Sequence, residues 1–191
     1  MTKAELRTIY KQKRLDISSK EKLKLDDLLL IQLQTFNFEG IKTLLTYWPM
    51  ANMAEPNTNL YSSYLRHMVE GLQITYPISD FTNNTMQATL IDEDTVYITN
   101  SFGITEPKAG EIINPIDIDL VFVPLLVSDK LGYRVGYGKG FYDRFLNQCK
   151  SDVALMGFSY FEPIDTISDT NDFDIPLNFC ITPNAVYEFD H

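Results

Sequence analysis

The sequence Leu131-Gly-Tyr-Arg-Val-Gly-Tyr-Gly-Lys-Gly-Phe-Tyr-Asp143 separates two segments with different patterns. Residues 120–127 before it form an apolar run that is typical of a buried strand, and residues 142–150 after it follow a helical pattern. Glycines between a strand and the start of a helix let backbone N–H groups surround an anion, which the positive end of the helix also attracts. Lys139 and Arg134 add positive charge to the same loop. The stretch therefore predicts a nucleotide phosphate site, and a flexible surface turn with incidental charges is the alternative.

The spacing of these glycines differs from that of two better-known phosphate-binding motifs. A Walker A loop has Ser or Thr directly after its lysine, whereas Gly140 follows Lys139 here. A Rossmann fingerprint has Gly-x-Gly-x-x-Gly soon after the first strand, whereas Gly136, Gly138 and Gly140 alternate with other residues late in the chain. The loop therefore indicates a phosphate site of another kind.

The composition excludes several classes of protein. A chain of 191 residues with 45% hydrophobic residues is long enough for a sizeable core, and we expect one domain over residues 1–191. The formal net charge of −10 disfavours a general nucleic-acid or acidic-membrane surface. No apolar stretch reaches the length of a membrane span, and the polar N-terminus lacks the apolar core of a signal peptide. Two cysteines without metal-type spacing favour reduced thiols and a cytoplasmic location.

Helical and strand patterns alternate along the chain. Capping sequences Thr2-x-x-Glu5 and Ser18-x-x-Glu21 are expected to open two helices. Segments rich in β-branched, aromatic or apolar residues are predicted strands, namely residues 41–48, 72–76, 120–127 and 153–159. Residues 86–91 and 95–99 flank an acidic turn and are predicted to form a hairpin. The alternation predicts an α/β fold whose sheet is covered by helices on both faces.

Four basic residues recur in the first predicted helix. Lys3, Arg7, Lys11 and Arg14 are spaced by four, four and three residues, which places them within roughly an 80° sector of a helix. Like charges at this spacing repel one another mildly, so the stripe suits an external anion. A solvated lysine-rich face is the alternative.

Five blocks in the chain together carry a family resemblance. They are Lys3-x-x-x-Arg7, Glu55-x-x-Thr58, Phe102-Gly-Ile-x-Glu-Pro107, Asp119-Leu-Val-Phe-Val-Pro124 and the long block Asp129-Lys-x-Gly-x-Arg-x-Gly-x-Gly-Lys-Gly-x-Tyr-Asp143. In these blocks the chain resembles the 5-formyltetrahydrofolate cyclo-ligase family, whose members are also called methenyltetrahydrofolate synthetases. The last block is long and specific, whereas the others are individually weak.

The resemblance implies a fold, a reaction and partners. The fold would be a Rossmann-like three-layer α/β/α sandwich with a mostly parallel sheet. The reaction would use ATP and Mg²⁺ to convert 5-formyltetrahydrofolate to 5,10-methenyltetrahydrofolate through a phosphorylated formyl group, releasing ADP and phosphate. The partner would be a small-molecule reduced folate, with no nucleic acid or membrane, and the protein would be a monomer or weak homodimer.

The resemblance also implies roles for individual residues. ATP contacts are implied for Lys3, Arg7, Arg134, Gly136, Gly138, Lys139, Gly140, Phe141 and Tyr142. Arg134 and Lys139 would be the catalytic cations. Folate contacts are implied for Met50, Glu55, Phe102, Tyr137, Gly138, Lys139, Gly140 and Phe141. The carboxylate of Glu55 suits the N–H donors of a pterin ring, and a solvated loop acid is the alternative.

Two positions concern the metal ion. Asp143 matches a magnesium ligand of the family, although an acidic residue is also favoured in the first turn of a helix. Asn178 is assigned to a second ligand position, where family members often have Asp, and its carbonyl oxygen would be a neutral ligand. Phe102 stands where members often have Trp, so an aromatic side chain is kept.

Two other functions remain open at this point. One is a nucleotide- or folate-binding protein that has the fold but does not catalyse turnover. The other is an ATP-dependent kinase of another small molecule. Dependence of ADP production on folate would distinguish them from a cyclo-ligase.

Overall fold

The computed structural model describes residues 1–190, and its first two helices begin where the sequence supplies caps. The helices are α1 (Lys3–Leu15), α2 (Ser19–Leu33), α3 (Thr58–Met68), α4 (Phe141–Leu146) and the short 3-10 turns η1 (Ala51–Met53) and η2 (Pro115–Asp117). The Thr2 side chain accepts a hydrogen bond from the Glu5 backbone N–H, and the Glu5 carboxylate accepts one from the Thr2 backbone N–H. Ser18 caps α2 in a similar way, through the backbone N–H of Glu21. Both predicted helix starts are therefore confirmed.

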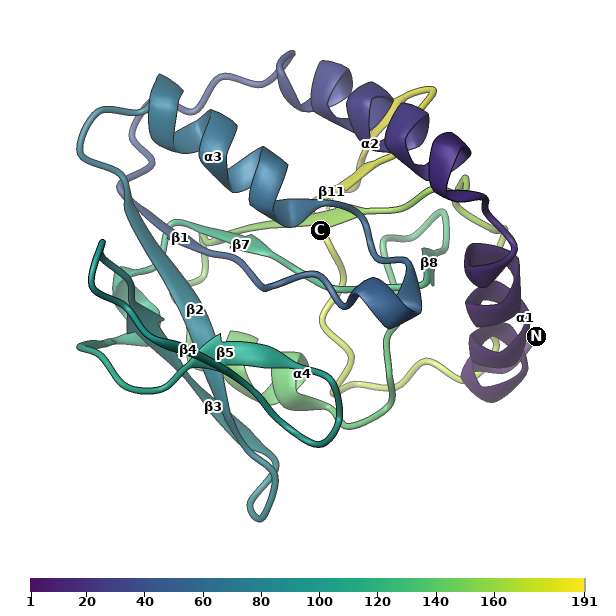
Figure 1. Cartoon of the computed structure of the whole chain (residues 1–191). Coiled ribbons are helices and arrows are strands. Elements are labelled where there is room, and N and C mark those ends of the chain that lie inside the picture. The colour runs from purple at the N-terminus through teal and green to yellow at the C-terminus, as the bar shows by residue number, and fades with distance from the viewer. Residues whose placement is uncertain (191) are drawn as a thin grey trace.

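One mixed sheet with eight strands organises the fold (Figure 1). Its strands in spatial order are β12 (Val186–Glu188), β11 (Phe179–Ile181), β10 (Ala154–Phe158), β7 (Leu120–Phe122), β1 (Thr43–Leu45), β2 (Gln73–Asp80), β3 (Thr85–Leu90) and β6 (Ile112–Ile113). The five strands from β11 to β2 are parallel, and the outer strands β12, β3 and β6 pair antiparallel. Two separate hairpins join β4 (Tyr97–Thr99) with β5 (Thr105–Pro107), and β8 (Val127–Ser128) with β9 (Arg134–Val135).

The two faces of the sheet bury different sets of side chains, because neighbouring residues in a strand point to opposite faces. Leu44 of β1 packs in a cluster with side chains of α2 and α3, which lie over one face (Figure 1). Leu45 packs in a second cluster with Phe145 and Leu146 of α4. The mostly parallel α/β/α sandwich is therefore confirmed. Among residues 1–190 no helix has the length and hydrophobicity needed to cross a membrane.

Two predicted elements differ from the structure. Residues 86–91 and 95–99 do not pair with each other, because β3 pairs with β2 and β6 while β4 pairs with β5. The apolar run at 120–127 is divided, since β7 ends at Phe122 and β8 begins at Val127 after an interruption that contains Pro124. Proline has no backbone N–H to donate to a sheet, so the run cannot continue as one central strand.

The segments that could form a site meet at one end of the sheet. β1 and β7 are parallel, so the chain leaves both strands at the same end, where η1 and Pro124 follow. We call residues 136–140, which follow β9, the glycine loop. Leu6 of α1 packs with Val127 of β8 and Val135 of β9, which holds α1 beside the glycine loop. Loops at the carboxyl ends of parallel strands are the usual place for ligands in such folds.

Candidate active site

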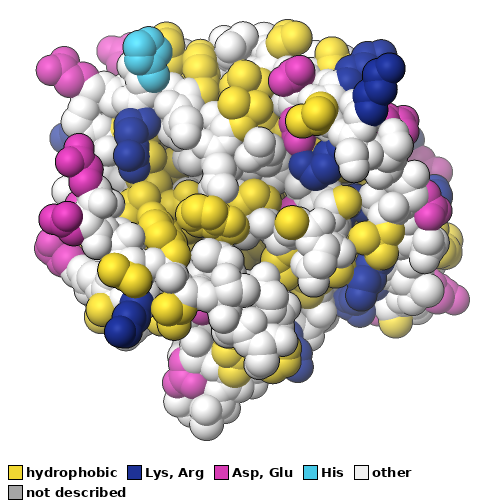
Figure 2. All heavy atoms as spheres, in the orientation of Figure 1, with side chains coloured by type: hydrophobic (Ala, Val, Ile, Leu, Met, Phe, Trp, Pro, Cys, Tyr) yellow, Lys and Arg dark blue, Asp and Glu magenta, His cyan; other side chains and the backbone are white. Residues whose placement is uncertain are grey.

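A cavity of about 380 Å³ opens at this end of the sheet, and we call it the cleft. Its lining comes from α1, the segment between β1 and α3, the hairpin of β2 and β3, β5, and the glycine loop with the start of α4. Figure 2 shows hydrophobic side chains gathered in the hollowed middle of the face that lies below α3. This size and the mixture of apolar walls with a few charged groups are typical of small-molecule sites.

The cleft brings together most residues that were predicted from the sequence. They are Lys3, Arg7, Met50, Glu55, Arg134, Gly136, Tyr137, Gly138, Lys139, Gly140, Phe141, Tyr142 and Asp143. Two predicted residues, Phe102 and Asn178, do not line it.

Helix α1 contacts the glycine loop directly, although they are far apart in the sequence. The Arg7 Nε donates a hydrogen bond of 2.8 Å to the Gly136 carbonyl oxygen. Gly138 has φ +90°, and a Cβ atom there would lie 3.1 Å from Nη2 of Arg7. Positive φ and this close approach both favour glycine. Arg7 therefore lies beside the glycine loop.

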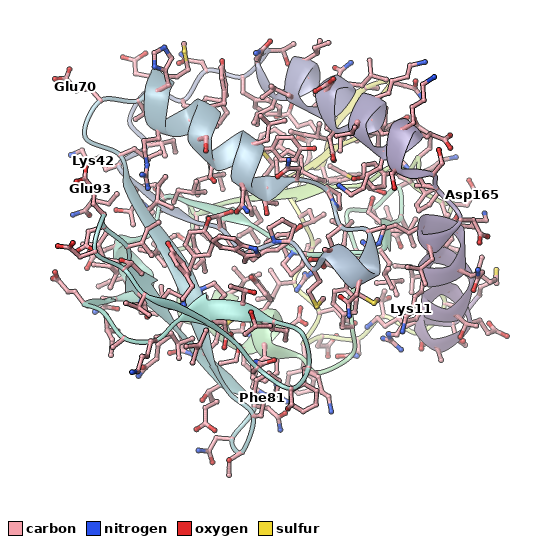
Figure 3. The ribbon with its side chains drawn as sticks, viewed as in Figure 1. Lys11, Lys42, Glu70, Phe81, Glu93 and Asp165 are labelled. Carbon is pink, nitrogen blue, oxygen red and sulfur yellow. The ribbon has the colours of Figure 1, made fainter. Side chains whose placement is uncertain are left out.

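Of the other three basic residues in the predicted stripe, only Lys3 reaches the cleft. Lys11 is exposed on α1 (Figure 3), and Arg14 is buried in the protein with 2% of its surface exposed. The predicted anion-binding stripe is thus wrong for Arg14, whose side chain is buried, and Lys11 fits the alternative of a solvated face.

Two carboxylates in the cleft are each paired with a cation. Nη2 of Arg134 lies 2.8 Å from Oδ1 of Asp143, and Nη1 donates to the carbonyl oxygen of Ile175. The ammonium group of Lys3 forms an ion pair with Asp174, which also accepts a 2.8 Å hydrogen bond from the Asn171 backbone N–H. The arrangement concentrates both signs of charge where the glycine loop meets α1.

Asn178 lies in a different place from the one predicted. The side-chain Oδ1 of Asn178 accepts a 2.8 Å hydrogen bond from the Leu155 backbone N–H. The backbone N–H of Asn178 donates to the Leu155 carbonyl oxygen at 2.9 Å. The side chain therefore links the region before β11 to β10 and lines a separate depression. This geometry contradicts a ligand position beside Asp143. Asp174, four residues earlier, is the residue of that segment that lines the cleft with Asp143.

Glu55 is held by hydrogen bonds from two other parts of the cleft wall. The Tyr137 hydroxyl donates to its Oε1 at 2.5 Å, and the Met50 backbone N–H donates to its Oε2 at 2.7 Å. Only 2% of Glu55 is exposed, and this burial raises the pKa of its carboxyl group. The carboxylate thus ties the segment after β1 to the glycine loop.

Arg14 completes this buried network and was missed as a member of the site. Its guanidinium donates to the carbonyl oxygens of Met53 at 2.8 Å and Leu125 at 3.0 Å, and also to the Tyr137 hydroxyl. The helical spacing placed Arg14 on the same side of α1 as Arg7, but a spacing does not tell a buried cation from an exposed one. Arg14 supplies the positive charge nearest to the Glu55–Tyr137 pair, and it helps to hold down the pKa of Glu55.

We expect Glu55→Gln to weaken folding as well as ligand binding. One amide position of Gln is a donor, so it cannot accept from both Tyr137 and Met50. The free energy of unfolding should fall by roughly 1–3 kcal/mol, measured by urea denaturation, and the affinities for ATP and folate should fall together. Glu70→Gln, at an exposed position (Figure 3), is the matched control and should change none of these. A loss of folate affinity alone, at unchanged stability, would instead support a direct contact between Glu55 and folate.

Three aromatic rings form one rim of the cleft. Phe81, at the end of the β2–β3 hairpin (Figure 3), stacks on Phe102 with ring centroids 4.7 Å apart. Phe81 also meets Phe141 edge to face at 5.2 Å. Phe102 is 59% exposed and lies behind Phe81, so Phe81 and not Phe102 lines the cleft. The sequence motif around Phe102 located the aromatic rim but not the residue that faces the cavity.

The chain is similar to proteins of known family along almost its whole length. The model of the 5-formyltetrahydrofolate cyclo-ligase family matches residues 1–182. The 5-formyltetrahydrofolate cyclo-ligase of Mycoplasma pneumoniae is 30% identical, over 93% of this chain and 97% of that protein. The 5-formyltetrahydrofolate cyclo-ligase of Mycoplasma genitalium is 28% identical, also over 93% of this chain and 97% of that protein.

Solved structures show the same similarity in three dimensions. The structure of 5,10-methenyltetrahydrofolate synthetase from Aquifex aeolicus superposes with a TM-score of 0.81 and 28% identity, covering 100% of this chain and 94% of the other. The structure of a 5,10-methenyltetrahydrofolate synthetase from Mycoplasma pneumoniae gives a TM-score of 0.73 and 27% identity, over 95% and 98% of the two chains.

Proposed function

The chain belongs to the 5-formyltetrahydrofolate cyclo-ligase family, and we propose that its cleft uses ATP and Mg²⁺ to convert 5-formyltetrahydrofolate to 5,10-methenyltetrahydrofolate. The observation that carries this proposal is the composition of the cleft. Its lining combines the glycine loop, Lys3, Arg7 and Arg134 with a set of apolar side chains. A phosphate-binding region beside an apolar wall suits a reaction between a nucleotide and a flat organic ring.

The proposed chemistry has two steps. The oxygen of an N-formyl amide is a poor leaving group, so it first attacks the γ-phosphorus of ATP, an O–P bond forms, and ADP leaves. N10 of the folate then attacks the formyl carbon and gives up its proton, and the bond from that carbon to the phosphorylated oxygen breaks. Phosphate departs with that proton, as hydrogen phosphate, while the ring closes. Such a reaction needs the protein mainly to position the reactants and to stabilise phosphoryl charge.

The positive side of the cleft supports the phosphoryl part of this proposal. Lys3, Arg7, Arg134 and Lys139 converge there in a protein whose formal net charge is −10. Arg134 presents a rigid fork suited to phosphate oxygens, whereas Lys139 is an exposed, mobile point charge. We assign Arg134 and Lys139 the stabilisation of charge on the transferred group, and Lys3 and Arg7 the binding of the other phosphates.

Asp143 and Asp174 fit a magnesium ion better than the predicted pair of Asp143 and Asn178. Mg²⁺ is commonly held by one or two carboxylates together with phosphate oxygens and water. Both side chains line the cleft, and residues 1–190 contain no group of three or more Asp, Glu, His or Cys that could hold a metal ion. When bound, Mg²⁺ supplies charge neutralisation for the phosphates. We infer that Arg134 and Lys3, now paired with these carboxylates, turn to the phosphates when ATP binds.

The apolar side of the cleft supports the folate part. Its lining includes the apolar side chains of Trp48, Pro77, Met86 and Ile104. A pterin ring can stack on such a surface, with its polar edge directed to a few hydrogen-bonding groups. We propose that the folate ring lies here, beside Met50 and Phe141.

The dependence of ADP release on folate distinguishes the proposed reaction from the two alternative functions, a kinase of another small molecule and a binding protein. With purified protein, ATP and Mg²⁺, we expect ADP to accumulate only when 5-formyltetrahydrofolate is added. ADP release that is indifferent to folate would favour a kinase of another small molecule. Tight folate binding without ADP release would favour a binding protein.

We expect Lys139→Ala to weaken ATP use without disturbing the fold. Lys139 is exposed, and only its backbone carbonyl makes a described hydrogen bond, which it accepts from Arg144 at 2.8 Å. Loss of a charge-assisted contact costs roughly 1.5–3 kcal/mol, so kcat/KM for ATP should fall about tenfold or more. Lys130→Ala removes another exposed lysine, which pairs with Asp165, and serves as the control. Normal kinetics in Lys139→Ala would remove that side chain from phosphate binding.

A further inference from the structure

Glu106 of β5 is a buried carboxylate in the cleft with half of its hydrogen-bonding capacity unused. Only 7% of the residue is exposed. Its Oε1 accepts hydrogen bonds from the Ser79 hydroxyl at 2.6 Å and the Ser79 backbone N–H at 3.1 Å. Its Oε2 accepts from no residue in the range 1–190. A carboxylate has about two acceptor sites on each oxygen, so Oε2 keeps both of its sites for a ligand.

The surroundings of Glu106 provide no positive charge to balance it. The ion pairs of the described residues do not include Glu106, and burial raises the pKa of its carboxyl group. The neighbouring cleft wall contains Pro77, Met86 and Ile104. Oε2 is not among the fully buried unpaired atoms of the described residues, so it is open to the cleft, and a carboxylate in such surroundings is costly unless a donor reaches it. The missing donor is therefore expected to come from whatever fills the cleft.

Glu55 differs from Glu106 in this respect. Each of its oxygens already accepts a hydrogen bond, one from Tyr137 and one from Met50, and both bonds hold parts of the protein together. A ligand could use only the second acceptor site of each Glu55 oxygen, whereas Oε2 of Glu106 has both of its sites open.

We propose that Glu106 is the specificity-determining residue that accepts a hydrogen bond from the 2-amino group of the pterin ring. This inference rests on the proposed function, because it names the part of the folate that the cleft recognises. The 2-amino group and the adjacent ring N–H of a pterin form an edge with two donors, which suits a carboxylate. The adenine edge presents one amino donor beside ring acceptors and suits it less well. Ser79 holds Oε1 and so fixes the direction in which Oε2 faces the ligand.

The test is a cycle that changes the protein and the ligand separately. Glu106→Gln keeps the shape of the side chain but loses the charge. The ligand partner is an analogue of 5-formyltetrahydrofolate in which methyl replaces the 2-amino group. Dissociation constants of both ligands are measured by calorimetry without ATP. The wild type should bind 5-formyltetrahydrofolate about 10- to 100-fold more tightly than the analogue, and Glu106→Gln should lose most of that discrimination. The affinity of Glu106→Gln for ATP should be unchanged.

Three controls make the result decisive. Glu111→Gln alters an exposed acid on the segment that follows β5 and should keep the full discrimination. Urea denaturation shows whether Glu106→Gln is folded, and Glu106→Asp, which keeps the charge at a shorter reach, should keep part of the discrimination. The proposal is overturned if Glu106→Gln still discriminates between the ligands while Glu55→Gln does not, or if Glu106→Gln loses ATP affinity instead. Failure of the proposed function would look different, because the wild type itself would make no methenyl product.

Discussion

Asp143→Asn is expected to reduce turnover by about a hundredfold or more. The substitution removes one of two carboxylates proposed for Mg²⁺ and leaves Arg134, whose side chain is only 6% exposed, without its counter-charge. Asp174→Asn should also reduce turnover, because it removes the other proposed carboxylate and leaves Lys3 without its counter-charge. Steady-state kinetics at increasing magnesium concentration measure both effects, and the magnesium concentration for half-maximal rate should rise in each variant.

Two further variants separate metal binding from a general loss of charge. Asp165→Asn breaks an ion pair with Lys130 in which Asp165 is 89% exposed, on the outside of the molecule (Figure 3), and should leave the kinetics unchanged. Asn178→Asp should also leave the magnesium requirement unchanged, because Asn178 binds the backbone of Leu155 outside the cleft. If Asn178→Asp lowered the requirement and Asp174→Asn did not alter it, the assignment of Asp143 and Asp174 would be wrong.

Arg14→Met should lower the free energy of unfolding by about 3–5 kcal/mol, the cost of removing one partner from a buried charged network. The Met53 and Leu125 carbonyl oxygens and the Tyr137 hydroxyl would lose a donor, and Glu55 would lose its nearest positive charge. Urea denaturation gives the change directly.

The control for Arg14 comes from the same helix. Lys11→Met removes an exposed cation of α1 and should change stability by less than about 0.5 kcal/mol. Combining Arg14→Met with Tyr137→Phe gives a double-mutant cycle, in which the two effects should be far from additive because the side chains are hydrogen-bonded. Additive effects, or an Arg14→Met protein as stable as the Lys11→Met protein, would show that the network does not hold the cleft together.

Local patterns located the glycine loop and the cation of α1 that lies beside it. The glycine loop could be recognised because the order of strand, glycines and helix is itself a local signal, and Arg7 because its helical spacing from Lys3 is local too. The capping residues Thr2 and Ser18 fixed the helix starts for the same reason.

The sequence alone could not predict which distant segments pair or pack with one another. Alternation located β3 and β4 as strands but did not say that each pairs with a different neighbour. Arg14 and Lys11 belong to the same pattern, yet packing buries one and exposes the other. Asn178 and Asp174 are both polar residues of one segment, and only the fold shows that Asp174 faces the cleft. Glu106 stands out only when the hydrogen bonds of both its oxygens are known.

The proposed reaction is tested most directly by following its product. Purified protein is incubated with ATP, saturating Mg²⁺ and 5-formyltetrahydrofolate, and the methenyl chromophore is recorded together with ADP. We predict that one methenyl product forms for each ADP released, and that Asp143→Asn, folded as judged by urea denaturation, forms almost none. A wild-type protein that binds both ligands but yields no methenyl product at saturating Mg²⁺ would contradict the proposed function.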